Sequence, residues 1–168
     1  TIPLDHRIYT NGFLFKEKEG ERHLDMSAVI SANIDMAYYR KLKQGFDVEN
    51  KDGVLIDHKK VTTDPNPPRS YAFCSDTAYN ESIIPIIQDV NVLYHESTFL
   101  DKHAKLAPQT KHSTAKEAAM IAKKANVGTL ILGHFSTRYN HLNEFKAEAL
   151  TIFEQVKLAG DGKTFKFD

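Results

Sequence analysis

Apolar and polar positions follow a regular pattern mainly in the second part of the chain. Short β-prone runs bounded by turn residues predict three strands, at 71–75, 91–95 and 129–133. Apolar positions spaced at threes and fours predict helices at 81–89, 114–126 and 143–156. Strands that alternate with helices indicate an α/β fold, with a sheet flanked by helices.

The first part of the chain is less regular. Residues 2–18 are typical of two short strands around a turn at Asn11-Gly12. Residues 26–42 carry a helical pattern with polar residues in its middle, so two short helices fit equally well. Residues 46–70 are irregular, and a last short strand is predicted at 164–167.

Length and composition favour one domain, residues 1–168. Lysine plus arginine and aspartate plus glutamate number 22 each, so the total charge indicates no particular partner. The one cysteine, Cys74, lies in an apolar run; this favours a buried thiol and excludes an intrachain disulfide. No apolar run approaches membrane-spanning length and no signal peptide is visible, so we expect no membrane association and a cytoplasmic location.

Groups with metal-binding chemistry stand at the ends of four predicted strands. They are His6, Asp76, the pair His95-Glu96, and His134. Imidazoles and carboxylates from separate strand ends are the ligands that zinc or manganese hydrolases need, and Asp76 has two oxygens with which to bridge two ions. Each group taken singly is more typical of an ordinary polar strand end, so spacing alone leaves both interpretations open.

Two further candidates lie beyond the second strand. His112 stands just before the capping box Thr114–Glu117, where it could exchange a proton and be oriented by Glu96, or be a plain surface histidine. Ser136 and Arg138 suit a phosphate. The lysine-rich segment 102–124 suits a polynucleotide backbone or a solvated helix face. Four histidines are interpreted as surface residues: His23, His58, His103 and His141.

Taken in order, the motifs resemble those of ribonuclease Z, the tRNA 3′-processing endoribonuclease with the metallo-β-lactamase fold. They are Ser75-Asp76-Thr77, His95-Glu96-Ser97-Thr98-Phe99, His112-Ser113-Thr114-Ala115 and the segment from Leu132 to Tyr139. Pro3-Leu4-Asp5-His6, followed by Gly12-Phe13, is similar to that family's metal-binding histidine upstream of its flexible arm. The resemblance covers essentially the whole chain. It implies the C-terminal half of an αββα sandwich, with a mixed sheet flanked by helices.

The resemblance also implies a metal site. Asp76 corresponds to the aspartate that bridges two zinc ions, His6 to a ligand of one ion and His134 to a ligand of the other. Manganese is an alternative metal, and a homodimer is expected.

The implied reaction is attack of a metal-bound hydroxide on a phosphodiester of precursor tRNA, which removes the 3′ trailer and leaves a 3′-hydroxyl. His112 and Glu96 correspond to the pair that delivers a proton to the leaving ribose oxygen. Ser136 and Arg138 lie in the turn that would meet the scissile phosphate.

Two features depart from the family pattern. The His-x-His-x-Asp-His motif is absent, because no two histidines here are separated by one residue. In the family this motif lies nearer the N-terminus, so we expect a missing N-terminal half and an inactive isolated fragment. Residues 12–45 have the extent of the family's arm-like insertion but lack its Gly-Pro-rich segment, which makes tRNA binding by this segment less firmly implied than the site.

Two alternative functions stay open. One is a metallo-β-lactamase-fold phosphodiesterase of small substrates, for which the arm would have no role. The other is a non-catalytic RNA-binding half that keeps the motifs without metal.

Overall fold

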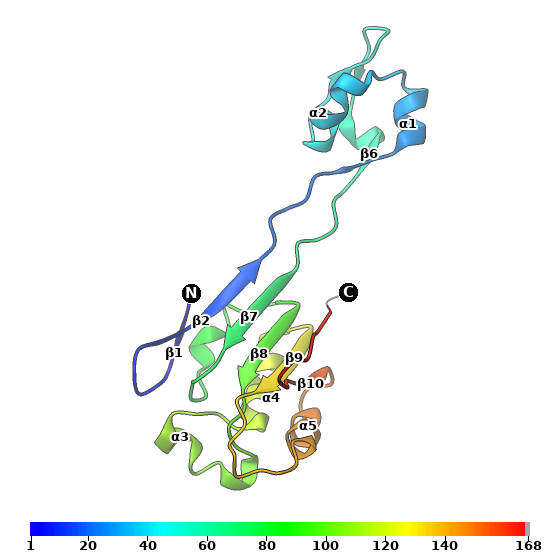
Figure 1. Ribbon diagram of the computed structural model, residues 1–168. Helices are drawn as coiled ribbons and strands as arrows, with labels where there is room; N and C mark the ends of the chain where they lie inside the picture. The colour runs from blue at the N-terminus through cyan, green and yellow to red at the C-terminus, as the bar shows by residue number, and fades with distance from the viewer. Residues whose placement is uncertain (167–168) are drawn as a thin grey trace. The chain divides into compact units, whose positions relative to one another are not determined.

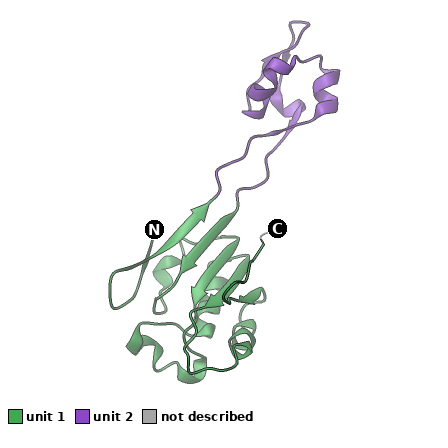
Figure 2. Cartoon of the chain, viewed as in Figure 1, with its two compact units in different colours: residues 1–16, 69–168 green, residues 17–68 purple. Residues whose placement is uncertain are grey.

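The structure, a computed structural model, describes residues 1–166. Its internal contacts divide the chain into two compact units, which Figure 2 distinguishes by colour. Unit 1 comprises Thr1–Lys16 and Arg69–Asp168, and unit 2 comprises Glu17–Pro68. The expected arm-like segment, 12–45, starts inside unit 1 and ends within unit 2, so its bounds differ from those of either unit.

Unit 1 is built on a six-stranded mixed sheet with the order β1-β2-β7-β8-β9-β10 (Figure 1). β2 is antiparallel to both of its neighbours, and β7 to β10 run parallel to one another. The strands span Ile2–Leu4 (β1), Thr10–Lys16 (β2), Ser70–Cys74 (β7), Val92–Glu96 (β8), Thr129–Gly133 (β9) and Val156–Leu158 (β10). The three strands predicted from the apolar runs, β7, β8 and β9, are confirmed to within one residue.

One face of this sheet packs against helices α4 (Ala115–Lys124) and α5 (Asn143–Leu150). α4 begins at Thr114, where the predicted capping box forms, and its alanines let the helix approach the strands closely. The short helix α3 (Ala107–Thr110) precedes it. Cys74 is fully buried in this core, and burial raises the pKa of its thiol to about 12.

The opposite face of the sheet carries aromatic side chains. Phe73 on β7 stacks on Tyr94 of β8 with ring centroids 4.7 Å apart, and Phe15 on β2 stacks on Tyr71 at 6.0 Å. Phe13 and Phe15 are 47% and 58% exposed, so this face is less covered than the helical one. This face therefore leaves aromatic side chains partly exposed, at least at Phe13 and Phe15.

Unit 2 is a separate small assembly of short elements. It contains two helices and four two-residue strands paired as β3 with β6 and β4 with β5. The elements are α1 (Met26–Ser31), α2 (Tyr39–Lys43), β3 (His23–Leu24), β4 (Val48–Glu49), β5 (Leu55–Ile56) and β6 (Thr62–Thr63). Two short helices thus replace one long one. The chain leaves the helical conformation between them, where Asn33 has a left-handed backbone with φ 56°.

Short 3₁₀ turns complete both units, at Met36–Tyr38, His58–Lys60, Glu81–Ile83 and Asp101–His103. The helix predicted at 81–89 is wrong, because only the 3₁₀ turn at its start forms. Pro85 lacks the N–H that would bond to the carbonyl of Glu81, which disfavours a regular α-helix, and only turns with isolated bonds such as Ile87 N–H to the Ile83 carbonyl follow. The helix predicted to reach 156 ends at Leu150, and β10 follows it.

Two smaller expectations also fail. Asn11-Gly12 is not a turn but part of β2, where a Cβ at Gly12 would lie 2.4 Å from the carbonyl oxygen of Phe73. Glycine at this position therefore serves the close approach of β2 and β7. Residues 164–166 form no strand, and Phe167 of the expected last strand lies outside the described residues.

Candidate metal and catalytic site

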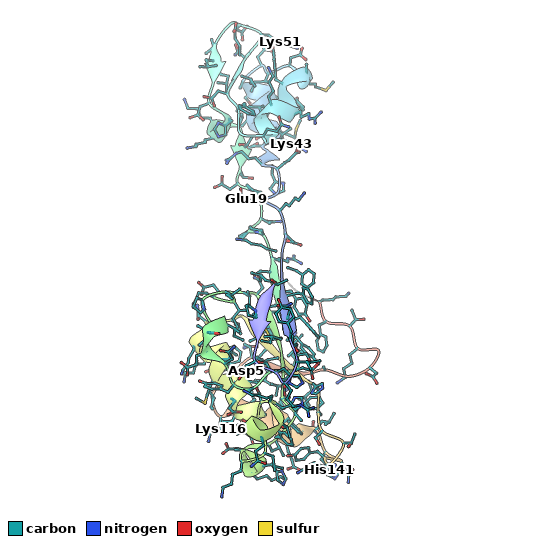
Figure 3. All side chains as sticks on the ribbon, turned by 90° about the vertical axis from the view of Figure 1, so that its left-hand side faces the viewer. Asp5, Glu19, Lys43, Lys51, Lys116 and His141 are labelled. Atoms are coloured by element: carbon teal, nitrogen blue, oxygen red, sulfur yellow. The ribbon has the colours of Figure 1, made fainter. Side chains whose placement is uncertain are left out.

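Four strands of unit 1 deliver the candidate side chains to one edge of the sheet. β1, β7, β8 and β9 all run in the same direction, because β2 is antiparallel to both β1 and β7. Their carboxyl ends meet at that edge, followed by His6, Asp76 and His134 and with Glu96 as the last residue of β8. Asp5, which precedes His6, marks the end of β1 in Figure 3.

Asp76 and His134 share an uncommon backbone conformation. Both are left-handed, with φ 58° and 56°; His134 directly follows β9, and Asp76 is separated from β7 by Ser75. Such a conformation costs free energy for a residue with a side chain and persists where the surroundings hold it, often at functional sites. The turn brings His134 Nε2 within 3.1 Å of Asp76 Oδ1. The two side chains are 39% and 43% exposed, so they remain accessible to a ligand.

The tautomer of His6 is set by a backbone carbonyl. His6 Nδ1 lies 2.9 Å from the carbonyl oxygen of Lys111. A carbonyl oxygen only accepts, so Nδ1 carries the hydrogen and Nε2 keeps a lone pair. A histidine in this state is prepared to bind a metal through Nε2.

His134 has the same arrangement with a different partner. Its Nδ1 lies 2.8 Å from Thr98 Oγ1, and that hydroxyl lies 2.7 Å from Glu96 Oε2. The hydroxyl has one hydrogen, for which the Glu96 carboxylate at 2.7 Å and the His134 carbonyl at 3.1 Å are both acceptors, so we assign the hydroxyl as the acceptor of the Nδ1 hydrogen of His134. The lone pair of His134 is therefore also on Nε2, the atom next to Asp76.

Glu96 is a fully buried carboxylate that is satisfied by hydrogen bonds. Its Oε1 accepts from the backbone N–H of Thr77 at 2.8 Å and from His112 Nδ1 at 2.7 Å. Its Oε2 accepts from the hydroxyl and backbone N–H of Thr98 and from the backbone N–H of Ser113. Several charge-assisted bonds of this kind compensate the burial of a carboxylate and position His112.

His112 lies between the two other imidazoles. Its ring centroid is 5.1 Å from that of His6 and 5.1 Å from that of His134. Ligand atoms of His6, Asp76 and His112 all lie within 4.8 Å of one another, and so do those of Glu96, His112 and His134. Because Glu96 is already saturated with donors and holds His112 by a hydrogen bond, we interpret Asp76, with His6 on one side and His134 on the other, as the candidate metal ligands.

Ser136 and Arg138 lie on the turn after His134. The backbone N–H of Ser136 bonds to the carbonyl of Thr98 at 3.2 Å, and the Arg138 guanidinium lies 5.5 Å from the ring centre of Phe99. A cavity of about 490 Å³ adjoins this turn and is lined in part by His134, Ser136 and Thr137. Arg138 does not line this cavity.

His95 does not accompany Glu96 into the site. It is fully buried, lies beside the helix-packed residues Cys74 and Leu132, and contacts the Glu96 carbonyl oxygen through Nδ1 at 2.7 Å. Its Nε2 has no hydrogen-bond partner within the described residues. Burial lowers the pKa of this imidazole, so it is held neutral.

Three residues with clear structural roles here escaped the sequence reasoning: Thr98, Lys111 and Asp5. Thr98 lies inside a motif that was noticed, but its bond to a histidine 36 residues away has no local signal.

A further group that could hold a metal, Asp47, Asp57 and His58, lies in unit 2, where His58 was interpreted as a surface residue. Asp57 there accepts from the backbone N–H of Lys59 and Asp47 from that of His58, so both carboxylates already have partners.

Comparison with known proteins identifies relatives along nearly the whole chain, although no family model matches. A ribonuclease Z of Cytophaga hutchinsonii is 46% identical over 166 residues, which are 98% of this chain and 53% of that protein. A ribonuclease Z of Porphyromonas gingivalis (strain ATCC BAA-308 / W83) is 44% identical over 96% of this chain and 53% of its own length. The chain is related to ribonuclease Z. It spans about half the length of the curated relatives it matches.

Solved structures agree on the fold. The metallo-β-lactamase fold protein YhfI from Bacillus subtilis matches with a TM-score of 0.53 and 27% identity, over 56% of this chain and 39% of that one. A long form RNase Z from yeast matches with a TM-score of 0.51 and 26% identity, over 57% of this chain and 13% of that one. The expected metallo-β-lactamase fold, with a mixed sheet and flanking helices, is confirmed. Among residues 1–166 no helix is long and apolar enough to cross a bilayer.

Proposed function

We propose that this chain contributes the C-terminal half of the active site of a metal-dependent endoribonuclease that removes the 3′ trailer of precursor tRNA. The proposal rests on one observation above all. The hydrogen-bonded pair His112–Glu96 stands beside Asp76, His6 and His134 at one edge of the sheet. The relationship to ribonuclease Z supports the RNA substrate.

The donor set fits a pair of zinc ions, with manganese as an alternative. Imidazole nitrogens and a carboxylate are the ligands that zinc takes in catalytic sites. His6 and His134 would each offer Nε2, because each Nδ1 donates its hydrogen elsewhere, and Asp76 would offer its two oxygens. When bound, such ions supply charge stabilisation at the phosphoryl oxygens and a water nucleophile at neutral pH.

His112 would act as the proton donor to the leaving ribose oxygen. Its Nδ1 donates to the buried Glu96 carboxylate, so a second proton would sit on Nε2, the atom left to face the substrate. Glu96 would orient the ring for this transfer through its hydrogen bond to Nδ1. The product would carry a 3′-hydroxyl. Ser136 and Arg138 would contact the phosphate beside this group.

The remaining ligands would come from an N-terminal half with the paired-histidine motif. Two observations support this partner: the relatives are about twice as long as this chain, and the aromatic face of the sheet leaves Phe13 and Phe15 about half exposed. The isolated chain should therefore bind zinc weakly and cleave no precursor tRNA. The homodimer and the cytoplasmic location stay predictions that sedimentation and cell fractionation would test.

The deciding experiment joins this chain to the complementary half of the C. hutchinsonii relative and measures cleavage of precursor tRNA with zinc or manganese. We expect cleavage at the 3′ trailer, its loss in Asp76→Ala, and a fall of about 10²–10⁴-fold in kcat in Glu96→Gln. Asp101→Ala is the matched control, because Asp101 belongs to an exposed ion pair on unit 1.

Other outcomes select the alternatives. Turnover of a chromogenic phosphodiester without tRNA cleavage would favour a phosphodiesterase of small substrates. RNA binding by an assembled protein that takes up no metal would favour a non-catalytic module.

A further inference from the structure

Lys111 connects two parts of the site that are more than a hundred residues apart in the chain. It follows α3 in a left-handed conformation, with φ 59°, and the backbone N–H of His112 bonds back to the carbonyl of Ala107 at 3.0 Å. This closed helix end directs the Lys111 carbonyl to one side and the His112 ring into the site.

Lys111 contacts two neighbouring residues, Asp5 through its side chain and His6 through its backbone carbonyl. We call Asp5 and His6 the corner. The Lys111 ammonium lies 3.0 and 2.9 Å from the two carboxylate oxygens of Asp5, and its carbonyl oxygen accepts from His6 Nδ1 at 2.9 Å. One residue therefore pairs with Asp5 and sets the tautomer of His6, while it is bonded covalently to His112.

We propose that Lys111 is a positioning residue that holds the candidate ligand His6 against the candidate proton donor His112. The purpose of this role, metal binding beside a proton donor, rests on the proposed function. Its geometry rests on the contacts described above. Partners that orient a metal-binding histidine typically change metal affinity by about 10- to 100-fold when they are removed.

An ordinary surface ion pair offers a matched control. Lys116 lies 3.1 Å from Asp101, with side chains 45% and 49% exposed, against 41% and 44% for Lys111 and Asp5. Figure 3 labels Lys116 and Asp5 on unit 1. Exposed pairs of this kind contribute only about 0–1 kcal/mol to stability, so removing either lysine should leave the fold intact.

The corner also has bonds that do not involve Lys111. The backbone N–H of Asp5 donates to Thr77 Oγ1 at 3.1 Å, and the Asp5 carbonyl accepts from Ala78 N–H at 2.8 Å. A Lys111→Met variant should therefore keep β1 in place, and it also keeps the backbone carbonyl that bonds to His6 Nδ1. It loses the ammonium that ties this carbonyl to the Asp5–His6 corner, so the bond to the His6 ring is held less firmly.

The test compares Lys111→Met, Lys111→Arg and Lys116→Met in chain 1–168 by two measurements. Imidazole ¹⁵N spectra at mildly alkaline pH, without metal, report the tautomer of His6. Calorimetric titration with zinc reports metal affinity. We expect the wild type and Lys116→Met to show a single Nδ1–H tautomer, Lys111→Met to show a mixture and about 10-fold weaker zinc binding, and Lys111→Arg to restore both.

The two measurements test the positioning role and the proposed function separately. A Lys111→Met protein with an unchanged His6 tautomer and unchanged zinc affinity would overturn the positioning role. A tautomer mixture in Lys111→Met would support the role even if no variant binds zinc, and that absence of binding would count against the proposed function alone.

Discussion

The two units of this protein hold themselves together in different ways. Among residues 1–166, the core of unit 1 gathers twenty buried residues from strands and helices far apart in the sequence, whereas unit 2 encloses a cluster of five: Val29, Ile34, Leu42, Val48 and Val61. In unit 2, aspartate side chains cap short helical turns. Asp25, for example, accepts from the N–H groups of Ser27 and Ala28. A small core of this kind is marginally stable.

The difference has a consequence for the site. The residues of the proposed catalytic site, His6, Asp76, Glu96, His112 and His134, all belong to unit 1, and its long-range packing positions them. Unfolding of unit 2 should therefore leave the candidate site intact. Loosening of the unit 1 core should disturb the positions of the candidate site residues.

The largest expected effect comes from core truncation in each unit. Phe145 is fully buried and packs edge-on against Phe135 and Tyr139, on the turn that follows His134. Phe145→Ala should cost about 3–5 kcal/mol and loosen that turn, while Leu42→Ala should cost about 2–5 kcal/mol in unit 2 alone.

The thiol of Cys74 reports which unit has opened. It is buried and its pKa is raised to about 12, so a thiol reagent should modify it only when unit 1 unfolds. Labelling should accelerate in Phe145→Ala and stay at the wild-type rate in Leu42→Ala. Equal acceleration in both variants would show that the two units unfold as one.

An intermediate effect is expected from pH. Burial lowers the pKa of His95, so the unfolded chain binds a proton that the folded chain refuses, and stability falls as pH drops below the usual histidine value of 6.5. The loss should approach about 1.4 kcal/mol per pH unit. The pKa values of Asp25 and Asp47 in unit 2 are lowered from 3.8 by hydrogen bonds, so their contribution is present above that value and is lost only under more acidic conditions.

Urea unfolding followed between pH 7.5 and 5 would separate these windows. Unit 1, followed by Cys74 labelling, should lose stability before unit 2, followed by amide exchange in α1. In His95→Leu the loss in unit 1 between pH 6.5 and 5 should shrink. If the His95→Leu profile keeps the wild-type slope, the buried imidazole is not its cause.

The smallest effect is expected at a helix cap. Thr114 accepts from the N–H of Glu117 and starts α4, so Thr114→Ala should cost about 1 kcal/mol and speed amide exchange in the first turn of α4. Thr114→Ser, which keeps the hydroxyl, is the control. Exchange in unit 2 should not change in either variant.

Local pattern predicted the elements whose signals are local. The capping box at Thr114 and the apolar runs of β7, β8 and β9 were enough to place them, since both signals lie within a few residues. The predictions failed where a distant contact decides. Gly12 lies in a strand because β7 passes close by, and residues 156–158 leave the helical pattern to pair with β9.

The candidate site followed the same rule. Strand ends and motif resemblance pointed to His6, Asp76, Glu96, His112 and His134, and the structure brings these residues together at one edge. The sequence could not indicate which nitrogen of each histidine is available, because Lys111 and Thr98 decide that from 105 and 36 positions away.

The hydroxyl of Thr98 has a broader meaning. It has a single hydrogen, and its nearer acceptor is Glu96 Oε2 at 2.7 Å, so we assign a lone pair of the same oxygen to His134 Nδ1. The nitrogen of His134 that is available to a ligand therefore depends on the hydrogen-bond acceptor that Glu96 provides for Thr98. Without that acceptor the hydroxyl could instead donate to Nδ1 of His134, which would place the hydrogen of the ring on Nε2, the atom next to Asp76.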